Sequence, residues 1–264
     1  MPPAVATLAA LAMVLGVAAA LRWPHLQLVP HVTDESAEVL FARAIAFDGA
    51  RPLTHADAYD GPWWPYLLAA VFRVAGSSVA LPRLFTFGLG LAAVAATFAL
   101  GAQLARPGQR LAAAGVAGLL LATHFTHAVV NSRVAWSNAT TPLWTTLAVL
   151  ALVAAVRGPS TPGFAIAGAL AGLALHTHPS VSVLLAALAL WLVVEPAGRA
   201  CFRTAGPWVG LGTALAAYSP VIVFNVREGF RSLAEAGAST NSAGDPTAGG
   251  WAGGVAAALA QLGR

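Results

Sequence analysis

The side chains best suited to chemistry in this sequence are carboxylates near its N-terminal end. Asp34 and Glu35 are adjacent, and Asp57 and Asp60 follow in a segment that also carries His55. A carboxylate held beside an attacking hydroxyl can take its proton, which is typically worth about 10²–10⁴ in rate. We therefore expect an acid–base site here, in which His55, Asp57 and Asp60 contact the substrate.

Both acidic groups also have a simpler interpretation. Residues 33–38 (TDESAE) are typical of a helix start, with Thr33 as the cap and acids in the first turn. Asp57 and Asp60 precede Gly61-Pro62, which is a common turn signal. The residues alone leave open whether these carboxylates do chemistry or form local structure.

Three arginines lie where they can bind an anionic group. Arg83 begins a long apolar run, Arg133 stands in the segment NSRVAW, and Arg227 follows the last apolar run. Guanidinium groups give bidentate contacts to phosphate, so these residues are candidates for a phosphate-binding role. Arg133 and Arg227 can equally extend into lipid headgroups from the ends of helices.

Histidines occur in two close pairs, His124-x-x-His127 and His176-x-His178. Imidazole is a common metal ligand, and a haem or copper site is conceivable, but no Cys or Met ligand accompanies these pairs. Hydrogen bonding at a site or an interface is the better interpretation, with His176 and His178 as substrate contacts. The single Cys201 permits no internal disulfide, and the sequence leaves a divalent cation undecided.

The aromatic cluster Trp63, Trp64 and Tyr66 has two interpretations. Aromatic rings gather at membrane–water interfaces, where they form a belt. The same rings can also serve as a platform for a sugar. The sequence does not decide between the two.

The composition indicates what kind of protein must position these residues. Of the 264 residues, 58% are hydrophobic and only 9% are charged, whereas soluble domains average about 25% charged residues. The mean hydropathy is +0.73. A water-soluble domain and a disordered chain are both excluded, and an all-α polytopic membrane protein is predicted. The 14 basic residues are all Arg and stand singly between apolar runs, which argues against nucleic-acid binding.

Seven segments are apolar enough to be transmembrane helices, which need roughly 20 residues. They are residues 4–21, 84–104, 111–130, 140–156, 163–175, 180–194 and 205–224. Residues 63–80 are interrupted by Pro65 and Arg73, so we expect them to lie at the membrane interface. The first segment has neither a basic start nor a cleavage pattern after it, which favours a retained span over a signal peptide.

The positive-inside rule then orients the chain. With a cytoplasmic N-terminus, five arginines fall in cytoplasmic loops: Arg106, Arg110, Arg157, Arg199 and Arg203. The acid-rich segment 22–62 becomes a long extracytoplasmic first loop, and the candidate site residues gather on that side. We expect residues 1–235 to form one membrane domain, with interfacial helices in 22–80. We expect residues 236–264 to form a loop and the start of a further helix, as in a fragment of a longer protein.

The order of these features is similar to a known family. Asp34-Glu35 is followed by an amphipathic stretch (ESAEVLFARAIAFDGARPL), by YDGPWWPYLLAAVFRVAGSS and by ALPRLFTFGLG, and later by NSRVAW, GLALHTHPS and AYSPVIVFNVREG. Over about residues 1–235 this resembles membrane glycosyltransferases of the GT-C fold, in the branch of the protein O-mannosyltransferases and aminoarabinose transferases (family 39-like).

The resemblance implies a function. Such enzymes move a sugar from a polyprenyl-phosphate donor to an acceptor on the outer side of the membrane, usually with inversion. The family's catalytic base maps onto Asp34, and Glu35 matches the second member of the pair. The acceptor can be protein, lipid or glycan, and relatives have more spans after the seventh helix. All-Arg, Ala-rich usage suggests a bacterial plasma membrane.

Two other functions remain as alternatives. A transporter for a lipid-linked or polar solute would carry ionisable residues in the middle of its spans. The polar residues here lie at helix ends, which argues against transport. A non-catalytic or truncated relative that binds a lipid-linked sugar is the other alternative.

Overall fold

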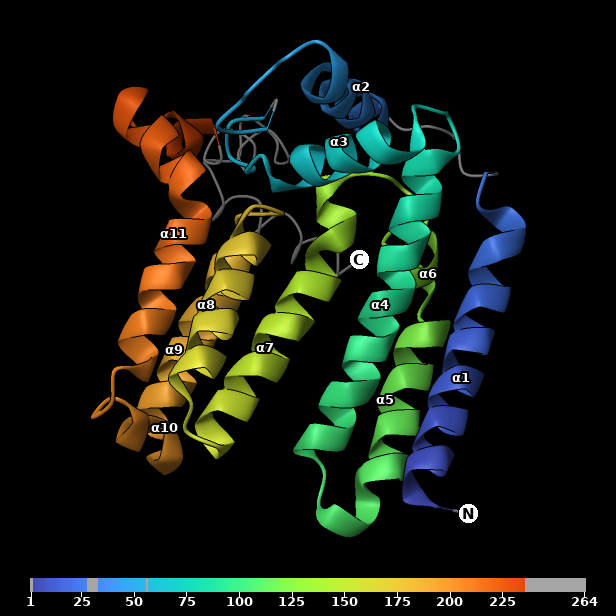
Figure 1. Cartoon of the computed structure of the whole chain (residues 1–264), viewed down its shortest axis with the longest axis vertical. Coiled ribbons are helices and arrows are strands. Elements are labelled where there is room, and N and C mark those ends of the chain that lie inside the picture. Colours follow the sequence, from blue (N-terminus) through green and yellow to red (C-terminus); the bar gives the residue numbers. More distant parts are fainter. Residues whose placement is uncertain (1, 28–32, 56, 236–264) are drawn as a thin grey trace, which may run out of the picture.

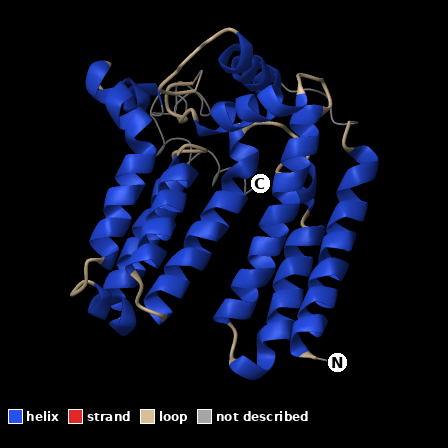
Figure 2. Cartoon of the chain, viewed as in Figure 1, coloured by secondary structure: helices blue, strands red, loops and turns tan. Residues whose placement is uncertain are grey.

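The computed structural model describes residues 2–27, 33–55 and 57–235, and these form helices joined by short connections, with no strand among them (Figure 2). The α-helices are α1 (Pro3–Arg22), α2 (Thr33–Phe47), α3 (Trp63–Ala75), α4 (Leu81–Leu104), α5 (Arg110–Thr123), α6 (Phe125–Val129), α7 (Thr141–Arg157), α8 (Thr161–Leu175), α9 (Val181–Val194), α10 (Pro196–Cys201) and α11 (Gly206–Arg227). Short 3₁₀ turns cover Trp23–His25, Pro107–Gln109 and Ser137–Thr140.

The long helices run side by side as a bundle, and α2 and α3 lie across one of its ends (Figure 1). We call this the α2–α3 end. Helices α1, α8 and α11 end there, while the α4–α5 connection and α10 lie at the opposite end. Helix α3 lies across the bundle rather than along it, which is the direction expected of a helix at the membrane interface. It ends at Gly76, whose φ of 78° suits glycine.

Four helical stretches are long and apolar enough to cross a membrane. They are Pro3–Arg22, Leu81–Leu104, Ser137–Arg157 and Gly206–Arg227. Helices α8 and α9 are apolar but shorter, with 15 and 14 residues. The chain is therefore an all-helical integral membrane protein.

One predicted helix is not continuous. The segment 111–130 breaks at His124, whose backbone is extended and whose side chain accepts a hydrogen bond from the backbone N–H of His127. The carbonyl oxygens of Leu121 and Ala122, at the end of α5, accept hydrogen bonds from the guanidinium of Arg22 on α1. The prediction of one helix was wrong because this contact between distant segments stabilises the end of α5.

Small residues let α8 and α11 pack closely. A Cβ atom on Gly168 would overlap the backbone oxygen of Gly210, and one on Gly172 would lie 2.5 Å from the oxygen of Ala214. The hydroxyl of Thr213 donates to the backbone oxygen of Ala165 across the same interface, at 2.8 Å. This is the close approach that small residues at four-residue spacing allow between membrane helices.

The two helices across the end of the bundle share a small core. Ala42 and Ile45 of α2 pack with Trp64, Leu68 and Phe72 of α3, all of them buried. Arg73 of α3 donates to the backbone oxygens of Ile45 and Ala46, both at 3.1 Å. A cation there satisfies carbonyl groups that the end of α2 leaves without helical partners. Helix α2 is thereby held in place over the bundle.

Candidate functional site

Five parts of the chain meet at the α2–α3 end and build the candidate site. They are the start of α2, the loop 48–62, the segment 130–140, the α8–α9 connection and the end of α11 (Figure 1). The sequence separates these parts by up to about 190 residues, so only the fold brings them together.

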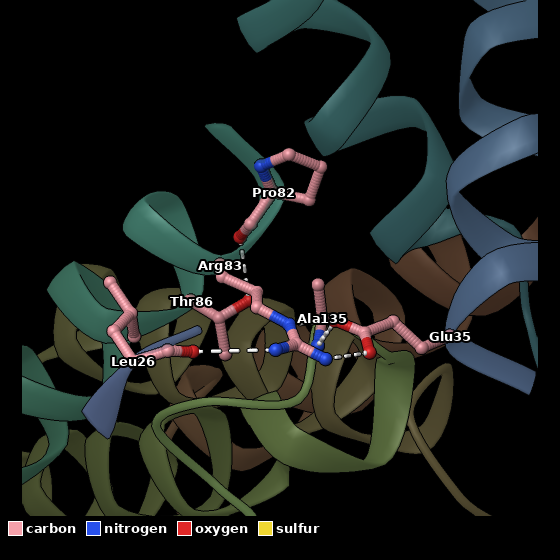
Figure 3. A network of polar contacts seen from close by, with 6 residues as sticks. All are labelled: Leu26, Glu35, Pro82, Arg83, Thr86 and Ala135. Carbon is pink, nitrogen blue, oxygen red and sulfur yellow. Dashed lines mark hydrogen bonds and ion pairs between the residues drawn. The ribbon is translucent and has the colours of Figure 1, made fainter. Parts of the chain in front are cut away.

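Glu35 and Arg83 form a buried ion pair between α2 and α4 (Figure 3). The Nε and Nη2 atoms of Arg83 donate to the two carboxylate oxygens of Glu35 at 2.8 and 2.6 Å. One of those oxygens also accepts from the backbone N–H of Ala135 at 3.0 Å. Such a fully bonded pair fixes geometry, because each charge depends on the other after leaving water. Glu35 therefore anchors the first turn of α2 to α4 and to the segment 130–140.

Asp34 differs from its neighbour because its side chain is exposed. No hydrogen bond joins Asp34 to another described residue. Its negative charge nevertheless acts on Glu38, His55 and Tyr59, since it shifts the pKa of each of these groups. Asp34 thus lies beside a cluster of titratable groups, in the same first turn of α2 as Glu35.

Glu38 is a buried member of that cluster, which the sequence analysis did not select as a site residue. Its carboxylate accepts from the backbone N–H of Ser137 at 2.7 Å and from the Ser137 hydroxyl at 3.2 Å. The Nε2 atom of His55 lies 3.7 Å from Glu38 Oε2. The sequence could have indicated Glu38 through its spacing, because it lies four residues after Asp34 and residues i and i+4 share a helix face.

Burial keeps Glu38 from ionising at neutral pH. Loss of hydration raises its pKa to about 8, although the hydrogen bonds from Ser137 oppose the shift. His55 is also buried, and loss of hydration lowers its pKa, so the ring stays neutral. Both ring nitrogens of His55 lack a hydrogen-bond partner among the described residues.

Asp60 completes the buried part of the cluster. Burial, with a smaller contribution from the charge of Asp57, raises its pKa to about 8, and its Oδ1 atom has no described hydrogen-bond partner. The loop around it is a turn, because the Asp60 N–H donates to the oxygen of Asp57 and the His55 N–H to that of Asp60. The turn interpretation and the site interpretation of this segment are therefore compatible.

The loop is fixed to the end of α8 through Gly61 and His176. The Gly61 N–H donates to the backbone oxygen of His176 at 2.9 Å, and a Cβ on Gly61 would overlap the His176 ring. The Nε2 atom of His176 lies 2.9 Å from the oxygen of Ala217 on α11. His178, in contrast, is only partly buried and bonds to Ser180 in its own turn. The structure therefore brings His176 into the site and keeps His178 apart.

The predicted phosphate-binding arginines have different surroundings. Arg133 donates to the backbone oxygens of Leu21 and Arg22, at the end of α1. Arg227 is exposed at the end of α11 and has no hydrogen bond from its side chain to another described residue. Of these two, Arg227 is the one whose guanidinium is available to a bound anion.

The histidine pair at 124 and 127 has a structural role. The Nδ1 atom of His127 lies 2.9 Å from Nη2 of Arg22, and His124 caps α6. Within the part of the chain that the structure describes, no three His, Cys, Asp or Glu side chains are arranged to hold a metal ion.

The aromatic cluster is divided between the core and a cavity. Trp64 is buried and stacks on Phe85 at 6.0 Å, while Trp63 makes an edge contact with Trp144 at 5.7 Å. A cavity of about 380 Å³ lies beside the site loop. Its lining is Pro52, Leu53, Pro62, Trp63, Tyr66, Leu173, His176, Ala217 and Pro220.

A second hollow lies on the other part of the loop, against α11. It has a volume of about 260 Å³ and is lined by Tyr59, Pro179, Tyr218, Ile222, Asn225, Val226, Phe230, Ser232 and Leu233. The hydroxyls of Tyr59 and Tyr218 have no hydrogen bond to another described residue. The acid cluster thus has a mostly apolar cavity near it and a hollow with two phenols.

A comparison with protein families identifies the family of the chain. Residues 59–224 match the family described as dolichyl-phosphate-mannose-protein mannosyltransferase. No curated protein and no solved structure gives a significant match. The match covers more than half of the chain, beginning just after the first helix of the α2–α3 end and ending in α11. The chain is thus a member of the dolichyl-phosphate-mannose-protein mannosyltransferase family, which are membrane glycosyltransferases of the GT-C type.

Proposed function

We propose that the chain transfers a sugar from a polyprenyl-phosphate donor to an acceptor hydroxyl, with inversion and with Asp34 as the general base. The family implies a lipid-linked donor and an acceptor in general. The observation that carries the assignment of the base is the contrast among the carboxylates of the site. Glu35 is bound to Arg83, and burial raises the pKa of Glu38 and of Asp60 to about 8, whereas Asp34 and Asp57 are exposed. Of these two, Asp34 is the residue onto which the catalytic base of the family maps.

The proposed reaction needs one proton acceptor and one anion contact. Asp34 takes the proton of the acceptor hydroxyl while its oxygen attacks the anomeric carbon. The bond between that carbon and the phosphate oxygen breaks, and polyprenyl phosphate leaves with the electron pair. Arg227 is the proposed contact for the phosphate, because its guanidinium is exposed. The buried acids Glu38 and Asp60, kept protonated, can donate hydrogen bonds without adding repulsive charge.

The remaining site residues have supporting roles in this proposal. Glu35 and Arg83 hold the first turn of α2, and His176 holds the loop that carries Asp57 and Asp60. The cavity beside Trp63 and His176 is the proposed place for part of the donor. His178, which bonds within its own turn, and Arg133, which bonds to the end of α1, are given no substrate contact in this proposal. The acceptor class, whether protein, lipid or glycan, is not specified by these residues.

The test uses the full chain in liposomes with radiolabelled polyprenyl-phosphate sugars. Asp34→Asn is expected to bind donor as the wild type does and to lose about 10²–10⁴ of the transfer rate, since the amide accepts no proton. Asp48→Asn, an exposed carboxylate after α2, is the matched control and is expected to keep the wild-type rate. Full transfer by Asp34→Asn would rule out this residue as the base.

A further inference from the structure

The chain folds back after α11 and returns to the site loop. We call residues 225–235 the return segment. Gly229 and Phe230 have φ values of 62° and 61°, which reverse the direction of the chain, and residues 231–235 form a helical turn. The Asn225 side chain closes this turn, because its Nδ2 donates to the Ser232 hydroxyl and its Oδ1 accepts from the Ser232 N–H. The return segment is therefore internally fixed before it meets any other part of the chain.

The return segment satisfies both backbone groups of Ala58. The Ser232 hydroxyl donates to the oxygen of Ala58, and Glu235 Oε2 accepts from the Ala58 N–H at 2.8 Å. Ala58 is 4% exposed and Ser232 is 6% exposed. A buried peptide group without partners is strongly disfavoured, so each of these bonds holds the loop where it is. Arg231 pairs with the other carboxylate oxygen of Glu235 at 2.6 Å, which orients Glu235.

Ala58 lies in the centre of the acidic loop. Asp57 precedes it, and Tyr59 and Asp60 follow. The loop is thus fastened at two points, at Ala58 by the return segment and at Gly61 by His176. Asp60 stands between these points, and its charge acts on Glu38 across the site. The family match covers residues 59–224, so the Ala58 contacts join two segments just outside both its ends.

We propose that Ser232 and Glu235 are positioning residues, which fix the backbone of Ala58 and thereby set the place of Asp57 and Asp60 beside Asp34 and Glu38. The effect of these residues on sugar transfer rests on the proposed function, whereas their hydrogen bonds to Ala58 do not. Neither residue contacts the predicted base. Both act through the loop, and loss of either bond lets water reach Asp60.

The first measurement is amide hydrogen exchange of loop 53–62 in the full, detergent-solubilised chain. Ser232→Ala and Glu235→Ala are expected to raise the exchange rate of the loop by tenfold or more. Glu235→Gln keeps an acceptor for the Ala58 N–H and is expected to restore most of the protection. Glu228→Ala removes an exposed carboxylate of the same segment and is the matched control. Unchanged exchange in both alanine variants would overturn the proposal.

The second measurement separates positioning from simple packing. Compared with Glu235→Gln, which lacks the same carboxylate, Glu235→Ala is expected to flatten the change of thermal stability between pH 4 and pH 8, because a hydrated Asp60 loses its raised pKa. The titratable groups whose charges interact with that of Asp60 are Glu38, Asp57, Tyr59 and Tyr218, and they are unchanged in both variants. If the loop amides exchange faster in Glu235→Ala but the pH dependence of its thermal stability is that of the wild type, Glu235 has no role in placing Asp60.

The third measurement is glycosyl transfer by the same variants. Glu235→Ala is expected to lower kcat by about tenfold with little change in KM for the donor, and Glu235→Gln to recover most of it. Wild-type kcat in a variant with a loosened loop would overturn the positioning role. If the wild type itself transfers no sugar, the proposed function fails, and the exchange and pH measurements still decide whether the loop is fastened as proposed.

Discussion

Adjacent carboxylates have different surroundings at the scale of single residues. Asp34 and Glu35 both lie in the first turn of α2, where acids suit the helix dipole. About 100° of helix rotation separates them, so Glu35 meets Arg83 while Asp34 stays exposed near Glu38. The helix-start interpretation and the site interpretation therefore describe the same residues, and of this pair Asp34 is the one that stays exposed.

The buried acids make stability depend on pH in a direction that can be worked out. Asp60 has an ordinary pKa of 3.8 and a pKa of about 8 in the folded chain. Between these values the folded state binds more protons than the unfolded state, so stability falls as the pH rises from about 4 to about 8. Glu38 acts in the same direction, while His55, kept neutral by burial, disfavours folding below pH 6.5.

Asp60→Asn is expected to remove part of this pH dependence. The amide cannot ionise, so the variant gains stability relative to the wild type as the pH is raised from 4 to 8. Thermal unfolding in detergent at several pH values measures the difference, with Asp48→Asn as the exposed control. A constant difference between Asp60→Asn and the wild type over this range would mean that Asp60 titrates normally in the folded chain.

At the scale of elements, packing between helices depends on a few small residues. The sequence pattern placed most helices within a few residues of their observed bounds, because apolar length and flanking charge are local properties. It could not predict the break at His124. The side chain that satisfies the end of α5 is Arg22, about 100 residues earlier in the chain.

Gly168 offers a direct test of the α8–α11 interface. Gly168→Ala places a methyl group against the backbone oxygen of Gly210, which cannot move without shifting α11. We expect a loss of about 1–3 kcal/mol of stability, as for other overpacked sites. Gly212→Ala on α11 meets no atom within 4 Å and is expected to stay within about 1 kcal/mol of the wild type. Equal stability of the two variants would contradict the close approach.

On the scale of the whole molecule, the bundle has chemically different ends. The α2–α3 end carries the acid cluster, and the opposite end carries arginines in its connections, including Arg106, Arg110, Arg199 and Arg203 (Figure 1). We propose that the α2–α3 end faces outside a bacterial plasma membrane, since short connections that carry arginine stay inside.

Single cysteines test that orientation in intact cells. In a Cys201→Ala background, Arg51→Cys is expected to react with a membrane-impermeant maleimide without permeabilisation. Gly108→Cys, in the α4–α5 connection, is expected to react only after the membrane is opened. The two positions are matched because both residues, Arg51 and Gly108, are exposed. The reverse labelling pattern would invert the proposed topology and place the acid cluster in the cytoplasm.

The sequence by itself determined the membrane environment, the positions of most helices and the family. Its apolar fraction requires a membrane, because so much hydrophobic surface has no other favourable environment. The carboxylates and arginines at helix ends indicated acid–base chemistry on an anionic substrate, and the order of motifs indicated the family, which the comparison confirmed.

Only the tertiary structure decided which side chains are available for that chemistry. The local sequence does not indicate that Glu35 pairs with Arg83 or that Glu38 is buried beside His55. It also does not indicate that Ser232 and Glu235 bind the backbone of Ala58. These contacts join residues 17 to 177 positions apart. The ionisation and the accessibility of each side chain depend on its burial and on its hydrogen-bond partners, rather than on its residue type alone. Burial and hydrogen bonding are properties of the folded chain.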